Sequence, residues 1–145
     1  MIKKEEIGTM RLLIADDSSM LRQRLIEEFS AFDKIEIVGE AQNSSQAIDF
    51  IRELKPDVLI LDIRMPDKGG IEVLEQIKND QYSPLIIIYT NYPYPQYRKK
   101  CAEAGAKYFF NKSAESEEMF KVIEHLSEKY PAPTFNLNQR NRSAK

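Results

Sequence analysis

The sequence of 145 residues contains few of the side chains from which many kinds of site are built. Cys101 is the only cysteine and His125 the only histidine. A single cysteine excludes an internal disulfide, and this pair cannot supply the four nitrogen and sulfur ligands of a structural zinc site. No apolar run approaches the ~20 residues that a membrane-spanning helix needs. We therefore expect neither a disulfide scaffold, nor a zinc site, nor a membrane span.

An excess of charge of one sign is also lacking. The 21 basic and 23 acidic residues leave a formal net charge of −2, which gives no global signal for binding to nucleic acid or membranes. Hydrophobic residues make up 42% of the chain, which is ordinary for one domain with a real core. Residues 1–9 have no apolar segment typical of a secretory signal, so the expected location is the cytoplasm.

The sequence does contain apolar runs that each end in polar residues. Strand-like runs lie at 11–15, 58–61, 85–89 and 108–110. The polar residues that follow them are Asp16 and Asp17, Asp62, Thr90, and Lys112. The carboxyl ends of parallel strands lie at one edge of a sheet, where ligands bind in open α/β folds. We therefore expect three carboxylates, a hydroxyl and an ammonium to meet in one crevice.

Helical patterns alternate with the strands. Apolar residues recur at helical spacing between the strands, as Leu21, Leu25 and Phe29 do. A further run at 35–39 begins by alternating apolar and polar residues, as an edge strand does. The runs at 58–61 and 85–89 are continuously apolar, as strands covered on both faces are. The pattern predicts an α/β fold, a flavodoxin-like five-stranded parallel sheet of order 2-1-3-4-5 with five helices on both faces.

The same pattern sets the expected boundaries. Residues 1–9 form an N-terminal extension, residues 10–130 a single domain, and residues 131–145, with two prolines and little periodicity, a flexible C-terminal tail. Ser18 or Ser19 is expected to cap the first helix, and Ser116 the last.

The expected acid cluster has a definite chemistry. Carboxylates within a few ångströms repel one another, so one takes up a proton or a cation binds among them. An all-oxygen site with open positions suits Mg²⁺. An aspartate in such a site can attack phosphorus, while Lys112 would offset charge on the phosphoryl oxygens and Thr90 could donate a hydrogen bond to one. The residues alone do not show which aspartate attacks.

Four segments carry the polar residues of the expected crevice and their surroundings: LIADDS at 13–18, LDIRMPDKGG at 61–70, YT at 89–90 and AGAKYFFNK at 104–112. Together these segments closely resemble the receiver domain of bacterial two-component response regulators. The resemblance covers roughly residues 10–130, in order. It implies that Asp62 accepts a phosphoryl group from a histidine kinase or histidine phosphotransferase, and that this switches the binding of a downstream protein. Such a protein catalyses only its own phosphorylation and dephosphorylation and is otherwise no enzyme.

The resemblance also implies a metal site. Asp17, Asp62 and the backbone carbonyl of Arg64 would bind Mg²⁺, and Asp16 would act mostly through water. Asp16, Asp17, Asp62 and Arg64 are therefore the expected metal-site residues, and Mg²⁺ is the expected cofactor.

A switch pair is implied in the same way. The hydroxyl of Thr90 would move toward the phosphoryl group as the ring of Phe109 turns inward. The face formed by the fourth helix, fifth strand and fifth helix would then change its partners, and a homodimer formed on phosphorylation is expected by analogy.

The chain departs from the usual pattern of the family at three places. Asn91 stands where a smaller residue is usual, and Ser113 stands where many members have proline. Arg64 and Tyr92 occupy variable positions that tune dephosphorylation, so the sequence does not predict the lifetime of the phosphoryl group.

The alternative functions require other residue patterns than the acid, Thr and Lys set of this sequence. An aspartate-nucleophile phosphatase of the haloacid dehalogenase type needs Asp-x-Asp and usually a substrate cap, whereas Asp16 and Asp17 are adjacent. A flavin site needs a phosphate-binding loop after the first strand, where these two acids would repel phosphate. A receiver-shaped adaptor that works without phosphorylation does not need the full acid, Thr and Lys set. Nucleic-acid contacts are expected only if an output domain is missing from this sequence, because too few residues follow Tyr130 for a helix-turn-helix domain.

Overall fold

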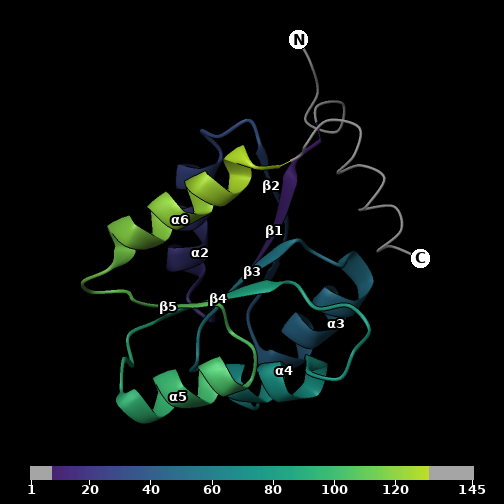
Figure 1. Ribbon diagram of the computed structural model, residues 1–145, viewed down its shortest axis with the longest axis vertical. Helices are drawn as coiled ribbons and strands as arrows, with labels where there is room; N and C mark the ends of the chain where they lie inside the picture. Colours follow the sequence, from purple (N-terminus) through teal and green to yellow (C-terminus); the bar gives the residue numbers. More distant parts are fainter. Residues whose placement is uncertain (1–7, 131–145) are drawn as a thin grey trace.

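The computed structural model describes residues 8–130, in which five strands form one parallel sheet (Figure 1). The strands are β1 Met10–Ala15, β2 Ile35–Ala41, β3 Val58–Leu61, β4 Leu85–Thr90 and β5 Tyr108–Asn111. Their order is β2-β1-β3-β4-β5, and every neighbouring pair is parallel. The predicted sheet and its order are therefore confirmed. The predicted tail at 131–145 and most of the predicted extension at 1–9 lie outside the described residues.

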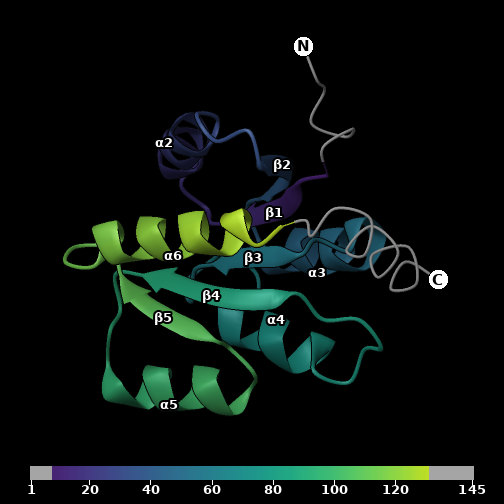
Figure 2. The same cartoon turned by 45° about the horizontal axis from the view of Figure 1, so that its top comes forward.

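Five helices cover the two faces of this sheet, as predicted. They are α2 Ser19–Phe29, α3 Ser44–Leu54, α4 Gly69–Ile77, α5 Pro95–Glu103 and α6 Ser116–Glu128. Buried residues of α3, α4 and α5 belong to one apolar cluster, and those of α2 and α6 to another. Figure 2 shows α6 and α5 on opposite sides of the sheet. The result is a three-layer sandwich with one cluster on each face of the sheet.

The inner strands take part in both clusters because successive side chains of a strand point to opposite faces. In β1, Leu13 and Ala15 pack into the cluster under α3 and α4, whereas Leu12 and Ile14 pack into the cluster under α2 and α6. All four are fully buried. This explains why β1 is continuously apolar after Arg11. Most residues of the edge strand β2 are only partly buried, as the alternating pattern predicts.

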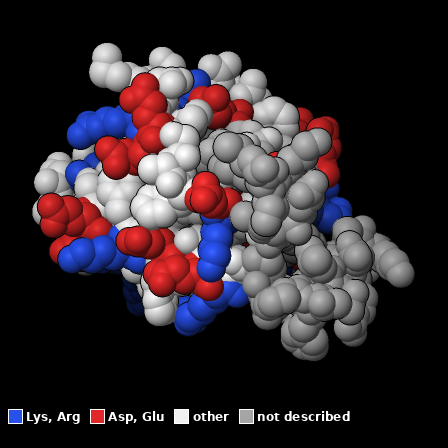
Figure 3. Space-filling view, turned by 90° about the horizontal axis from the view of Figure 1, so that it is seen from above, with Lys and Arg blue, Asp and Glu red and all other residues white. Residues whose placement is uncertain are grey.

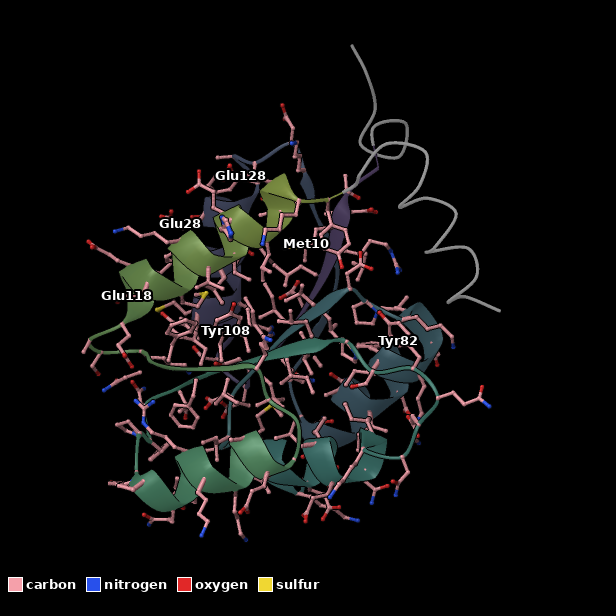
Figure 4. The ribbon with its side chains drawn as sticks, in the orientation of Figure 1. Met10, Glu28, Tyr82, Tyr108, Glu118 and Glu128 are labelled. Atoms are coloured by element: carbon pink, nitrogen blue, oxygen red, sulfur yellow. The ribbon has the colours of Figure 1, made fainter. Side chains whose placement is uncertain are left out.

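The side chains drawn in Figure 4 fill the space between the sheet and the helices. Tyr108 lies between β5 and α6, where its ring stacks on that of Phe110 with 5.9 Å between centroids. Glu118 and Glu128 lie at the exposed surface of α6. Acidic and basic side chains are interspersed on the face shown in Figure 3. Among residues 8–130, no helix has the length and apolar character to cross a bilayer.

The two predicted caps have different outcomes. Ser18 caps α2, because its hydroxyl accepts a hydrogen bond from the N–H of Leu21 at 3.1 Å. The prediction for Ser116 was wrong, since α6 already includes this residue and the cap position is Glu115. The Ser116 hydroxyl instead donates to the carbonyl of Lys112 and lies 2.6 Å from the hydroxyl of Tyr89. The Ser116 hydroxyl therefore bonds to Lys112 and Tyr89 and does not cap the N-terminus of α6.

Candidate functional site

The polar residues predicted to meet are held at the carboxyl-end edge by hydrogen bonds that extend the sheet beyond its strands. The N–H of Asp16 donates to the carbonyl of Ala41 at 2.9 Å, and the N–H of Asp62 donates to that of Ala15 at 3.0 Å. The N–H of Lys112 donates to the carbonyl of Thr90 at 2.8 Å. The loops after β1, β3 and β5 therefore each begin in a fixed register with the adjacent strand.

Lys112 joins two of the acids directly. Its Nζ atom lies 2.6 Å from Oδ2 of Asp16 and 3.0 Å from Oδ2 of Asp62. Asp16 and Asp62 are buried and Lys112 is largely covered, with exposed side-chain fractions of 4%, 6% and 12%. Charge-assisted hydrogen bonds of this kind are among the strongest in proteins, and one ammonium here serves two carboxylates.

Asp17 completes the acid cluster from the solvent side. One carboxylate oxygen from each of Asp16, Asp17 and Asp62 lies within 4.8 Å of the others, and only Asp17 is exposed. Three carboxylates provide the hard oxygen ligands that Mg²⁺ prefers, and an exposed member leaves a side open to water and phosphate. The residues therefore fit a magnesium ion.

Burial and neighbouring charged groups shift the pKa values of Asp16 and Lys112. Burial raises the pKa of Asp16, and hydrogen bonds from Lys112 and from the N–H of Ser18 offset this only in part. Burial lowers the pKa of Lys112, but its contacts with Asp16 and Asp62 outweigh burial and hold that pKa above its usual value. The lysine is therefore a permanent cation. With only one ammonium among three acids, the cluster favours a further cation.

A residue that sequence reasoning missed holds the first acid in place. The Nη1 atom of Arg22 donates to the backbone carbonyl of Asp16 at 2.6 Å, and its Nε atom lies 2.9 Å from Oε1 of Glu40. The Oδ1 atom of Asp16 also accepts from the N–H of Ser18 at 2.9 Å. Helix α2 and strand β2 together therefore fix the loop after β1. Arg22 appeared in the sequence only as a polar residue of a helix.

The loop between β3 and α4 packs tightly against Asp62. The N–H of Gly70 donates to the carbonyl of Ile63 at 2.7 Å. A Cβ atom on Gly70 would lie 2.1 Å from the carbonyl oxygen of Asp62, so only glycine fits there. The N–H of Arg64 lies 3.4 Å from Oδ1 of Asp62. The start of α4 is therefore locked to the residue that ends β3.

The two predicted switch residues lie on neighbouring strands. Thr90 is fully buried, and its hydroxyl accepts a hydrogen bond from the N–H of Tyr92 at 3.3 Å. Phe109 is half-buried at the cluster that α5 covers. The guanidinium of Arg98 lies 4.5 Å from the centroid of its ring and 3.4 Å from a carboxylate oxygen of Glu115. An ion pair between α5 and the residue before α6 therefore covers the ring of Phe109.

Comparison with known proteins agrees with this fold. The family model described as the response regulator receiver domain matches residues 12–124. The chain belongs to the response regulator receiver family. Receiver domains of this family are phosphorylated on an aspartate in a Mg²⁺-dependent reaction of two-component signalling.

Similar proteins include two regulators of transcription. The chain is 36% identical over 112 residues to transcriptional regulatory protein DesR of Bacillus subtilis, covering 77% of this chain and 55% of DesR. It is 34% identical over 134 residues to DNA-binding transcriptional activator EvgA of Escherichia coli, covering 90% of this chain and 63% of EvgA. The chain thus spans between half and two thirds of the length of these relatives.

A solved structure supports the same assignment. A DNA-binding response regulator of the LuxR family from Staphylococcus aureus has a TM-score of 0.74 and 31% sequence identity, with 81% of this chain and 98% of that chain covered. The family model and this structure therefore both indicate a response regulator.

Arg64 and three tyrosines connect the loop after β3 with the loop after β4. The guanidinium of Arg64 lies over the ring of Tyr92, 4.3 Å from its centroid, and a contact with Tyr97 raises the pKa of Arg64. The rings of Tyr94 and Tyr97 lie 5.8 Å apart, and 49% of Tyr94 is exposed. The aromatic loop after β4 therefore reaches across to the loop after β3.

Proposed function

We propose that this receiver takes up a phosphoryl group on Asp62. The observation that carries the proposal is the buried bridge from Lys112 to Asp16 and Asp62. Both carboxylate oxygens of Asp16 have hydrogen-bond donors within 2.9 Å, and Asp17 is exposed at the rim. Asp62 has a strong donor on Oδ2, but only a 3.4 Å contact on Oδ1. Asp62 is therefore the buried acid with an oxygen most available for attack on phosphorus.

The metal-binding residues of the proposed site are Asp16, Asp17, Asp62 and the backbone carbonyl of Arg64. When bound, Mg²⁺ would neutralise part of the charge on the carboxylates and on the incoming phosphoryl oxygens. The all-oxygen character of the acid cluster supports this assignment. The proximity of Arg64 to Asp62 in the same loop supports its inclusion.

Lys112 and Thr90 would stabilise the transferred group. The ammonium of Lys112 would offset negative charge on a phosphoryl oxygen, and the hydroxyl of Thr90 would donate a hydrogen bond to another. In this reaction the P–N bond of a phosphohistidine breaks and a P–O bond to Asp62 forms. Attack of water on that acyl phosphate later releases phosphate. The receiver thus catalyses only its own phosphorylation and dephosphorylation, with a histidine kinase or histidine phosphotransferase as donor.

The output would arise at the face made by α5, β5 and α6. Thr90 moving toward the phosphoryl group would give up its contact with the N–H of Tyr92. The space left would admit the ring of Phe109, which must then leave the guanidinium of Arg98. This change would alter binding of a downstream protein or of a second copy of the chain. Contact with DNA would need a further, output domain; EvgA, of which this chain spans 63%, is by its name a DNA-binding protein.

Intact-mass measurement after incubation with acetyl phosphate tests this function. We expect the wild-type protein to gain one phosphoryl group with Mg²⁺ and none with EDTA, and the Asp62→Asn variant to gain none. Asp33→Asn is the control, because Asp33 is an exposed acid of another loop. A gain in the Asp62→Asn variant equal to that of the wild type would contradict the assignment.

A further inference from the structure

The hydroxyl of Ser44 serves a loop that belongs to another part of the chain. Ser44 is the first residue of α3 and is 1% exposed. Its Oγ atom accepts hydrogen bonds from the N–H of Lys68 at 2.9 Å and of Gly69 at 2.6 Å. The Ser44 hydroxyl and N–H also point to the carbonyl of Pro66, at 3.3 and 3.4 Å. One buried residue thus contacts three residues of the loop between β3 and α4.

Helix α4 needs this contact because its own residues do not cap it. The cap position of α4 is Lys68, whose side chain makes no capping hydrogen bond. The first N–H groups of a helix have no partner within the helix and need one from elsewhere. For α4, the Ser44 hydroxyl supplies an acceptor to the first residue, Gly69. The start of one helix therefore caps the start of another.

The loop also adopts a conformation that requires support. Asp67 has a φ of 82° and Gly69 a φ of 83°. The left-handed conformation is unfavourable for a residue with a side chain, so Asp67 stores strain that its surroundings must balance. The side chain of Asp67 accepts a hydrogen bond from the hydroxyl of Ser45. Two adjacent serines at the start of α3 thus hold the loop at Asp67 and at Gly69.

The loop between β3 and α4 carries two residues of the proposed phosphoacceptor site. The loop runs from Asp62 to Gly69 and includes Arg64. At its far end, the hydrogen bond from Gly70 to Ile63 fixes the start of α4 against the residue after Asp62. A shift of Gly69 would therefore be passed to Ile63 and Asp62, because Gly70 has no free space toward the carbonyl of Asp62.

We propose that Ser44 is a positioning residue for the phosphoacceptor site. Its hydroxyl holds the loop between β3 and α4 so that Asp62 and the carbonyl of Arg64 keep the geometry needed to bind Mg²⁺ and to receive the phosphoryl group. This inference rests on the proposed function of Asp62. Ser44 itself contacts no reacting atom and acts through Lys68 and Gly69.

Two serine-to-alanine variants test this role. Ser44→Ala removes the acceptor from the loop. Ser127→Ala is the matched control, because Ser127 is 2% exposed and its hydroxyl donates to the carbonyl of Glu124 within α6. Three quantities are measured for both: amide hydrogen exchange of Lys68 and Gly69, the dissociation constant of Mg²⁺ by calorimetry, and the initial rate of phosphorylation against acetyl phosphate concentration.

We expect exchange at Lys68 and Gly69 to become about tenfold faster in Ser44→Ala, as the loss of a hydrogen bond to a buried group predicts. We expect Mg²⁺ binding to weaken about threefold to tenfold and the maximal phosphorylation rate to fall, with Ser127→Ala unchanged in all three. Ser44→Thr, which keeps the acceptor oxygen, should restore the protection of both amides and the affinity for Mg²⁺.

The role of Ser44 is overturned if Ser44→Ala leaves Mg²⁺ affinity unchanged, or if both alanine variants change it equally. Failure of the proposed function gives a different result. In that case the wild-type protein gains no phosphoryl group from acetyl phosphate, while hydrogen exchange and Mg²⁺ affinity still report on Ser44.

Discussion

The Nζ atom of Lys112 lies 2.6 Å from Oδ2 of Asp16, although 96 residues separate them in the chain. Replacing Lys112 by methionine would leave Asp16 and Asp62 buried without a counter-charge. Removing one partner from a buried charge network costs about 3 kcal/mol, so we expect a loss of that size in the free energy of unfolding without metal. Urea unfolding in EDTA measures it. Mg²⁺ should restore part of the loss.

The control for this variant is Lys107→Met, at an exposed lysine just before β5. We expect it to change the free energy of unfolding by about 0.5 kcal/mol or less, as is usual for a surface residue. Equal losses in the two variants would show that the Lys112 ammonium has no special part in balancing the acids.

Asp17 should determine how much Mg²⁺ raises the melting temperature of the protein. At about one hundred times its dissociation constant, a ligand that binds only the folded state stabilises it by about 2.7 kcal/mol. We expect wild-type protein to melt at a higher temperature in Mg²⁺ than in EDTA. Asp17→Asn should reduce this difference and should raise the melting temperature in EDTA, since one of three mutually repelling carboxylates becomes neutral. Asp33→Asn, at an exposed loop acid, serves as the control. If Mg²⁺ raises the melting temperature of Asp17→Asn as much as that of the wild type, Asp17 does not bind the metal.

Gly70 should tolerate no side chain. In Gly70→Ala the new Cβ atom would lie 2.1 Å from the carbonyl oxygen of Asp62, so the backbone must move. We expect a loss of about 3 kcal/mol or more in the free energy of unfolding, together with weaker Mg²⁺ binding. Gly105→Ala gives the comparison, because Gly105 has a φ of 102° but open space around its Cβ position. A loss of about 1–2 kcal/mol from backbone strain is expected there, with Mg²⁺ binding unaffected. Similar Mg²⁺ affinities in both variants would contradict a link between the packing of Gly70 and the site.

Cys101 should be chemically inert in the folded protein. The side chain is fully buried, and burial raises the pKa of its thiol to about 11. Because the thiolate is the reactive form and the pKa is raised, the thiol stays protonated until the pH approaches that value. At pH 8 we expect very slow labelling by a thiol-reactive disulfide reagent, and complete labelling after unfolding in urea. Rapid labelling of the native protein would mean that α5 opens readily.

The fold was predictable because its strongest signals are local. The continuous apolar run at 58–61 identifies an inner strand without any knowledge of its partners, and the alternation at 35–39 identifies an edge. Strand order then followed from the α/β pattern. The same topology brought Asp16, Asp17, Asp62 and Lys112 to one edge, where the structure has them.

The supporting contacts of the site were not predictable in this way. Ser44 bonds to residues 24 and 25 positions later in the chain, and no periodic pattern marks such a pair. Arg22 looks in the sequence like any charged residue on an exposed helix face, yet its guanidinium reaches the carbonyl of Asp16. Ser116 failed as a predicted cap because its hydroxyl found the carbonyl of Lys112 and the hydroxyl of Tyr89. The partners of these side chains are distant in the sequence or belong to the packed core, so only the tertiary structure identifies them.

The separation of Lys112 from Asp16 has a consequence for synthesis. The acids follow the strands β1 and β3, whereas the lysine follows the last strand, β5, so the lysine leaves the ribosome long after the acids have emerged. A growing chain that has not yet docked β5 would lack the ammonium of Lys112 beside its acids. If Asp62 accepts the phosphoryl group as proposed, we expect a chain that ends before β5 to take up none.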